Sequence, residues 1–201
     1  MNPGVSTWRP WVVVVGGFLG AGKTSLILAA CSILEKRGTR CAVITNDQGE
    51  ELVDTRLVEQ QDITVSEVTG GCFYCRFSDL LSAFETLRNY TPDVIFAEPV
   101  GSCIDIVATA LRPLHQDFER CRVTPFTVLV DPSRLAELVS GKMDADMSFL
   151  MRKQMQEADI LCLTKSDLYP EAATYPGTVL GQLSGATPLC LGARTGEGVE
   201  Q

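Results

Sequence analysis

Residues 11–24 read Trp-Val-Val-Val-Val-Gly-Gly-Phe-Leu-Gly-Ala-Gly-Lys-Thr, and this stretch decides the fold. The apolar, mostly β-branched residues 11–15 predict a strand that is buried on both faces. Residues 17–24 match the pattern GxxxxGK[ST], whose glycines let backbone N–H groups close around phosphates. A helix that begins near Lys23 adds the positive end of its dipole. A strand, a glycine loop and a helix in this order predict a nucleotide-binding P-loop.

The polar residues of this loop have separate expected roles. Lys23 places a cation at the β and γ phosphates, and the Thr24 hydroxyl can ligate Mg²⁺. The expected nucleotide-binding residues of the loop are Gly20, Ala21, Gly22, Lys23, Thr24 and Ser25. A glycine-rich turn that binds nothing is the plain alternative, but all fixed positions and the strand-to-helix context favour the phosphate loop.

The same kind of apolar run recurs along the chain. Further strands are expected at 63–68, 41–45, 94–97, 126–130, 160–163 and 188–191. Helical patterns lie between most of them, at 23–36, 78–89, 104–118, 134–139 and 144–157. This alternation predicts an α/β fold, a P-loop NTPase with a mostly parallel sheet and helices on both faces. The segment 168–185 is expected to be a loop with at most a short helix at 179–183.

Length and composition favour one soluble domain. The 201 residues fit a single domain over 1–201 with no second domain. Because residues 196–199 look like the start of a helix just before Gln201, we expect this domain to be truncated before its last helix. The longest apolar stretch near the N-terminus is far shorter than the roughly 20 residues that span a bilayer, so no membrane segment is expected.

The charge of the chain limits the kinds of partner that it can bind, and its cysteines indicate the compartment in which it is expected. The chain carries 17 Lys and Arg against 25 Asp and Glu, a net charge of −8, without a basic tract, which excludes a typical nucleic-acid binder. The 8 cysteines are scattered, and nothing resembles a secretory signal, so we expect reduced thiols in the cytoplasm.

Two motifs near the C-terminus resemble the base-reading loops of GTPases. Thr164-Lys165-Ser166-Asp167 resembles NKxD, and 192–194 resembles SA[KLR]. This resemblance implies that Asp167 accepts from guanine N1–H and the exocyclic amine, that Lys165 lies along the base, and that the Ala193 N–H meets guanine O6. Thr164 replaces the usual Asn and Gly192 the usual Ser, which we expect to weaken ties within the site more than base choice. The alternative for Asp167 is a helix N-cap.

Four segments together resemble the CobW-like family of GTPases, relatives of HypB and UreG. They are GFLGAGKTSLI at 17–27, NDQGE at 46–50 followed by Asp54, EVTGGCFYC at 67–75, and EPVG at 98–101. The resemblance runs from Val12 to Val199. It implies that Asp47 and Glu98 lie near Mg²⁺ and the γ-phosphate, where they would act in catalysis together with Lys23.

The same resemblance implies that Cys72 and Cys75 hold a transition metal. Tyr74 stands where the family has a further Cys, so one thiolate is missing, and the pair supplies only half of a tetrahedral site. Cys103 is the nearest replacement; Glu67, or the same pair from a second copy in a homodimer, are the others. Inert or redox-active thiols on a turn are the alternative for the pair.

The remaining sulfur residues have plainer expected roles. The other cysteines fall on predicted helices and strands and are assigned to the core. Four methionines at four-residue spacing mark one helix face, Met143, Met147, Met151 and Met155. A core face is the commoner meaning, and a surface for a partner or a soft metal is the alternative.

These expectations combine into one hypothesis. The chain is expected to be a Mg²⁺-dependent GTPase that acts as a metallochaperone or metal-insertion switch. Hydrolysis of GTP to GDP and phosphate would gate transfer of Zn²⁺ or Co²⁺ to a client metalloprotein or to an enzyme of a metal-cofactor pathway. Asp47, Glu50 or Glu98 would orient the attacking water, and the sequence does not choose among them. A P-loop small-molecule kinase and a nucleotide-regulated binding module with little turnover are the alternatives.

Overall fold

The computed structural model describes residues 8–46, 63–69, 71–73, 75–117, 121–169 and 188–200. Its described strands form one sheet in the order β3-β2-β4-β1-β6-β7-β8, with β5 pairing β1 beside this path. Every pairing between these strands is parallel. The strands are β1 (Trp11–Gly17), β2 (Cys41–Thr45), β3 (Thr64–Glu67), β4 (Val94–Glu98), β5 (Arg122–Val123), β6 (Thr127–Val130), β7 (Ile160–Leu163) and β8 (Leu189–Cys190).

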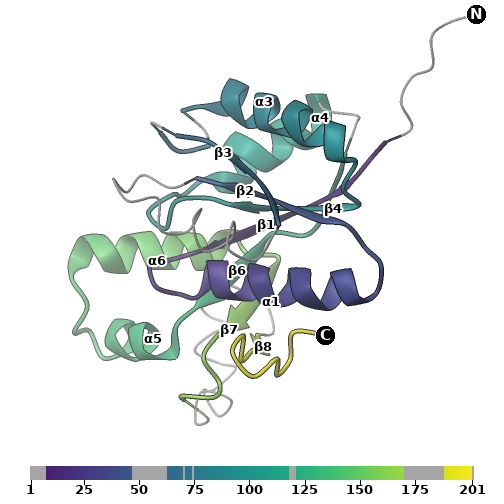
Figure 1. The fold of residues 1–201 in the computed structure, drawn as a ribbon. Helices are drawn as coiled ribbons and strands as arrows, with labels where there is room; N and C mark the ends of the chain where they lie inside the picture. Colours follow the sequence, from purple (N-terminus) through teal and green to yellow (C-terminus); the bar gives the residue numbers. More distant parts are fainter. Residues whose placement is uncertain are drawn as a thin grey trace, which may run out of the picture.

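Helices cover both faces of this sheet, as the alternation of strands and helices predicts (Figure 1). α3 and α4 lie on one side of the sheet and α1 on the other (Figure 1). The described helices are α1 (Lys23–Lys36), α3 (Phe77–Leu87), the 3₁₀ turn η1 (Arg88–Tyr90), the π-helix η2 (Val107–Leu111), α4 (Arg112–Asp117), α5 (Pro132–Val139) and α6 (Ala145–Glu157). The α/β P-loop fold class is therefore confirmed.

Two hydrophobic clusters fill the space between the sheet and its helices. The larger cluster joins residues of α3, α4, α5 and α6 to the sheet and includes Phe84, Leu114 and Met155. The smaller cluster packs α1 against the other face through Ile27 and Cys31. Because both faces are covered, the central strands β2 and β4 are apolar except at their last residues, Thr45 and Glu98, and β2 is buried at every position.

Parallel strands bring their carboxyl ends to one edge of the sheet, and this edge positions the candidate site. β4 lies between β1 and β2, and Thr45 at the end of β2 pairs with Glu98 at the end of β4. The end of β7 lies next to the end of β6 in the same way. Residues that follow β1, β4, β6 and β7 therefore gather at this edge.

The structure differs from the expected elements in three places. The two-residue β5 was not expected, and the helix expected at 104–118 begins as the π-helix η2. The helix expected at 196–199 is wrong: these residues form turns, because Gly196 and Gly198 have φ of 78° and 71°, which a right-handed helix cannot accommodate. The short helix expected at 179–183 lies outside the described residues.

The buried sulfur residues follow expectation in most cases. Met151 and Met155 are buried in the larger cluster, which confirms the core interpretation for these two. Met143 packs against this cluster but precedes α6, and Met147 is half-buried, so the four methionines do not form one buried helix face. Cys31, Cys41, Cys121 and Cys162 are buried, whereas Cys190 is half-buried. In the described part of the chain, no helix combines the length and hydropathy needed to cross a bilayer.

Candidate functional site

The phosphate loop follows β1 with a backbone that only glycine tolerates at its key positions. Gly17 has a φ of 136°, and a Cβ there would lie 2.5 Å from the Leu129 carbonyl oxygen. Gly22 has a φ of 90° and precedes α1 without any side-chain cap. The N-terminus of α1, which is the positive end of the helix dipole, therefore lies at the phosphate loop without a side-chain cap.

Three buried polar side chains meet beside this loop. The Thr24 hydroxyl lies 3.0 and 3.1 Å from the two carboxylate oxygens of Glu98. The Lys23 Nζ lies 3.7 Å from Glu98 Oε1. Residues Lys23, Thr24 and Glu98 are only 7%, 8% and 4% exposed. The end of β4 thus presents its carboxylate to the first turn of α1, which makes a cluster of one cation, one anion and one hydroxyl.

A pocket opens in front of this cluster. Its lining residues are Leu19, Gly20, Gly22, Lys23, Thr24, Ser25, Glu98 and Lys165. It is an open hollow of about 280 Å³, near the lower end of the usual range of small-molecule sites. Most of the residues expected to bind nucleotide therefore line one pocket.

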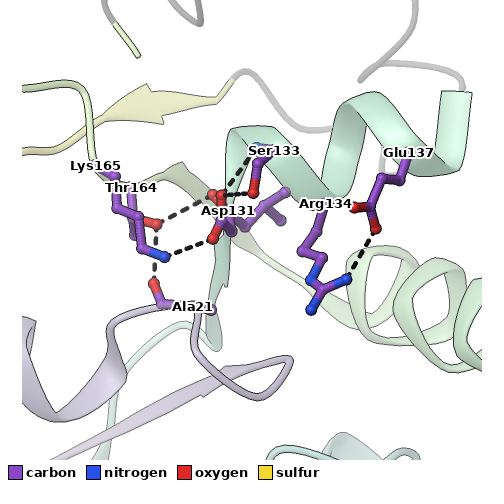
Figure 2. A network of polar contacts seen from close by, with 8 residues as sticks. Ala21, Asp131, Ser133, Arg134, Glu137, Thr164 and Lys165 are labelled. Carbon is purple, nitrogen blue, oxygen red and sulfur yellow. Dashed lines mark hydrogen bonds and ion pairs between the residues drawn. The ribbon is translucent and has the colours of Figure 1, made fainter. Parts of the chain in front are cut away.

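A second polar network joins the loop to the ends of β6 and β7 (Figure 2). The Thr164 hydroxyl lies 2.8 Å from the Ala21 carbonyl and 3.2 Å from that of Val130. Thr164 therefore ties β7 to the phosphate loop. Thr164 replaces the Asn that is usual at this position, and this replacement is expected to weaken contacts within the site. The Thr164 hydroxyl nevertheless reaches the phosphate loop, so this contact is kept.

Asp131 anchors Lys165 in this network. The Lys165 Nζ lies 2.5 Å from Asp131 Oδ2, and Asp131 also caps α5 by accepting from the Ser133 N–H and hydroxyl at 2.8 Å (Figure 2). Burial alone would raise the pKa of Asp131, but the bonds from Lys165 and Ser133 outweigh it and lower that pKa. Asp131 is the N-cap of α5, and Pro132 occupies the first turn of that helix.

Asp167, the residue expected to read the base, already has a partner. The Arg194 guanidinium donates from Nε at 3.0 Å and from Nη2 at 2.8 Å to Asp167 Oδ2. The Asp167 side chain is 8% exposed and that of Arg194 is 74% exposed. Any base that binds Asp167 has to share this carboxylate with the exposed Arg194 side chain. Asp167 does not cap a described helix.

The turn at 192–197 explains why glycine replaces the usual Ser at 192. A Cβ on Gly192 would lie 2.5 Å from the Thr195 hydroxyl oxygen and 3.0 Å from that of Ser166. The two hydroxyls fill the space that a side chain would need. Ala193 follows directly in this turn and is half-buried.

The cysteines expected to bind metal lie on two segments at the same edge. Cys72 Sγ lies 3.4 Å from Cys75 Sγ. Burial raises the pKa of Cys103 to about 12, and the Cys72 thiol, which is close enough to act on Cys103, adds to this rise. All 8 cysteines lie in the described part of the chain, and none forms a disulfide. Among the described residues, no group of three or more His, Cys, Asp and Glu side chains is arranged to hold a metal ion.

Two buried amides hold the segments that carry these thiols. The Asn46 Nδ2 donates to the carbonyls of Val68 and Gly71 at 2.8 and 2.7 Å. The Gln154 Nε2 donates to the carbonyls of Gly101 and Cys103, both at 2.9 Å. Each amide thus fixes the backbone next to one cysteine of the group.

The structure brings together some of the expected residues and leaves others aside. Lys23, Thr24, Glu98 and Lys165 share one pocket, while Asp167 and Ala193 lie beyond it on the turns after β7 and β8. Asp47, Glu50, Asp54 and Tyr74 lie outside the described residues. Gln154 was not among the residues expected at the site, although a polar residue three positions after Met151 on an apolar helix face is a visible signal.

The nucleotide-binding domain model of the CobW/HypB/UreG family matches residues 11–184. The chain belongs to this family. The stretch matched by this CobW/HypB/UreG model contains the phosphate loop, all the cysteines except Cys190, and Asp167. The expected resemblance to CobW-like GTPases is therefore confirmed.

Individual relatives agree with this assignment. The chain is 30% identical to the zinc chaperone YjiA of Escherichia coli over 165 residues, which are 80% of this chain and 51% of YjiA. It is 28% identical to the zinc chaperone CobW of Pseudomonas aeruginosa over 221 residues, 91% of this chain and 56% of CobW. The chain thus spans about half the length of these two members of the CobW/HypB/UreG family.

A solved structure agrees on the fold. The hydrogenase maturation factor HypB from Archaeoglobus fulgidus superposes with a TM-score of 0.66 at 16% identity, covering 96% of this chain and 86% of HypB. At this identity the likeness shows the fold alone.

Proposed function

We propose that the chain is a Mg²⁺-dependent GTPase that acts as a metallochaperone or metal-insertion switch. Hydrolysis of GTP to GDP and phosphate would gate transfer of a transition metal to a client metalloprotein. The observation that carries this proposal is the buried contact of Thr24 with Glu98, because one short segment joins Glu98 to Cys103. A nucleotide and a metal would therefore act on the two ends of one segment.

Nucleotide binding rests on the open end of α1 and the pocket before it. Backbone N–H groups over 20–25 would bind the phosphate oxygens, and Lys23 would place its cation at the β and γ phosphates. Asp167 would select guanine, because its carboxylate accepts from two donors that adenine does not offer together. Lys165, held by Asp131, would lie against the base and ribose.

The donor set beside the phosphates fits Mg²⁺. The Thr24 hydroxyl and the Glu98 carboxylate are oxygen ligands, which hard divalent cations prefer. Bound there, Mg²⁺ would neutralise charge on the β and γ phosphates. Asp47 would join this set from the chain that continues after Asn46, whose N–H donates to the Glu98 carbonyl at 3.1 Å. Asp47, Glu50 or Glu98 would orient the attacking water.

The cargo site is proposed on the thiols. Cys72 and Cys75 would supply two thiolates, and Cys103 a third. Two of the similar proteins are named zinc chaperones, which supports Zn²⁺ as the cargo, with Co²⁺ as a second metal that accepts the same ligands. The fourth coordination position of the metal would stay open so that a client can take the metal, or it would be filled by a ligand from a second copy of the chain.

Steady-state phosphate release tests this function. We expect turnover of GTP that requires Mg²⁺, exceeds turnover of ATP, and disappears in Thr24→Ala. The matched control is Thr86→Ala, on the exposed face of α3, which should keep wild-type turnover. Equal use of ATP would contradict the guanine assignment. Phosphate transfer to an added small-molecule acceptor would indicate a kinase, and tight binding without turnover would indicate a binding module.

A further inference from the structure

Gln154 is a buried amide on the apolar face of α6. Its residue is 5% exposed, and its neighbours on the helix, Met151 and Met155, are 3% and 0% exposed. Burying a primary amide is unfavourable unless its donors are satisfied. Here both donors are satisfied away from the helix, on the carbonyls of Gly101 and Cys103. The Gln154 side chain therefore hydrogen-bonds to the segment after β4 and not to its own helix.

This segment is pressed against the phosphate loop. A Cβ on Gly101 would lie 2.8 Å from the Leu19 N and 3.0 Å from the Leu19 Cα. Both atoms belong to the backbone of the loop, so neither can move aside as a flexible side chain would. Gly101 is the point where the two segments touch, and its carbonyl is one of the two that Gln154 holds.

A second side chain of α6 fixes the same segment further along. The Glu157 carboxylate accepts from the Asp105 N–H at 2.6 Å and from the Val107 N–H at 3.5 Å. Within the segment, the Cys103 N–H donates to the Val100 carbonyl at 2.9 Å, which closes a turn. α6 thus supports a short, internally bonded unit from Gly101 to Val107.

The chain from Glu98 to Val107 contacts α1 and the phosphate loop through its first residues and carries a thiol at Cys103. Glu98 holds Thr24, Gly101 touches the loop, and Cys103 lies beside Cys72. Asn46 holds the other cysteine segment in a similar way, but its two bonds, to Val68 and Gly71, lie on the thiol side. The Gln154 amide, in contrast, bonds both to Gly101, which touches the phosphate loop, and to Cys103, which carries the thiol.

We propose that Gln154 is the positioning residue that couples the nucleotide state to the position of Cys103. This inference rests on the proposed function. With both carbonyls held by one side chain, a displacement of Gly101 by the occupied phosphate loop carries Cys103 with it. Without the amide, the two ends of the segment can move separately. The affinity for the nucleotide then no longer depends on whether the metal is bound, and the affinity for the metal no longer depends on the nucleotide.

The test compares Gln154→Met with Gln156→Met in the full chain. Methionine matches the length and volume of glutamine but has no donor, and Gln156 is an exposed residue on the same helix. Calorimetry gives the affinity for a non-hydrolysable GTP analogue with Mg²⁺, in the presence and absence of Zn²⁺. We expect Zn²⁺ to tighten the analogue by about 5- to 150-fold in the wild type and in Gln156→Met. In Gln154→Met we expect a ratio near one, with the affinity measured without Zn²⁺ little changed.

The outcomes separate this inference from the proposed function. A ratio near one in the wild type would refute the coupling itself, whatever Gln154 does. A wild-type ratio that persists in Gln154→Met would overturn only the role of Gln154. Hydrogen exchange on the wild type supplies a measurement that needs no variant: the amides of residues 101–107 should exchange more slowly when the analogue binds, and again when Zn²⁺ is added. Unchanged exchange over 101–107 would overturn the inference.

Discussion

Lys23, Thr24 and Glu98 are at most 8% exposed, whereas Cys72 is half-buried and Cys75 is exposed. We refer to the first group as the nucleotide side and to the cysteines with Cys103 as the thiol side. Both lie at the carboxyl edge of one parallel sheet. On the nucleotide side, cation, carboxylate and hydroxyl are already in contact with one another. On the thiol side, two sulfurs meet and the third belongs to a different segment.

This difference matches two different tasks. A buried, mutually bonded cluster holds its geometry before the ligand arrives, which favours tight and repeatable binding of phosphates. An exposed thiol pair leaves a metal accessible to other ligands, which favours transfer. The contact of Gly101 with Leu19 joins the two sides.

Lys23→Ala should damage the nucleotide side alone. Loss of the buried cation removes charge-assisted bonds worth about 1.5–3 kcal/mol each, so triphosphate affinity should fall by roughly 100-fold or more. Calorimetry with GTP measures the loss. Lys36→Ala, at the exposed end of the same helix, is the control and should bind GTP as the wild type does. Unchanged affinity in Lys23→Ala would exclude this loop as the phosphate site.

Asp167→Ala should change which nucleotide binds without affecting metal binding. A carboxylate that accepts two donors contributes about 1.5–3 kcal/mol, so the preference for GTP over ATP should shrink by roughly 10- to 100-fold. Competition between the two nucleotides measures this ratio directly, and ATP affinity serves as the internal reference. A preference that survives the substitution would assign base reading to another residue.

The pair Gly101→Ala and Gly71→Ala compares the two sides by the same change. At Gly101 the new Cβ meets the Leu19 backbone at 2.8 Å, whereas at Gly71 it meets the flexible Arg76 Cγ at 3.0 Å. Gly101→Ala should therefore cost about 1–3 kcal/mol of stability and weaken GTP binding. Gly71→Ala should cost less, because Arg76 can move away. Thermal melting measures the loss of stability in both variants, and GTP titration measures the loss of affinity. Equal effects in the two variants would mean that Gly101 does not pack tightly against the Leu19 backbone.

Asp131→Asn should lower stability by about 1 kcal/mol at neutral pH, because the ion pair with Lys165 is lost. The pKa of Asp131 is lowered in the folded protein from its ordinary value of 3.8. Its contribution is therefore complete above about pH 4 and disappears as the pH falls through the lowered pKa. Denaturant unfolding of both proteins from pH 7 downward should show their difference closing at acid pH. A difference that grows on acidification would contradict the assignment.

Much of the fold can be predicted from the sequence, because its central strands are uninterrupted apolar runs between helical patterns. The expected bounds of β2, β7 and α1 agree with the structure. β5 escaped prediction because two residues carry no periodic signal, and η2 because a π-helix keeps an apolar pattern close to that of an α-helix.

The candidate site could be predicted only where a local motif marks it. Lys23 and Thr24 belong to such a motif, whereas Asp131 meets Lys165 across 34 positions of the sequence, a contact set by the pairing of β6 with β7. The contact of Gln154 with Gly101 depends in the same way on how α6 packs against the sheet. Contacts of this kind depend on tertiary packing. Their partners have no fixed spacing in the sequence, so they cannot be predicted from one sequence.

In the proposed function, the nucleotide state sets the metal affinity of the thiol side. Titration of Zn²⁺ into the protein loaded with Mg²⁺ and either GDP or a non-hydrolysable GTP analogue tests it most directly, with Cys72→Ser as the control that removes the site. We predict that the analogue tightens Zn²⁺ binding by about 5- to 150-fold relative to GDP, and that Cys72→Ser loses the tight site in both states. Equal Zn²⁺ affinities in the two nucleotide states of the wild type would contradict the claim.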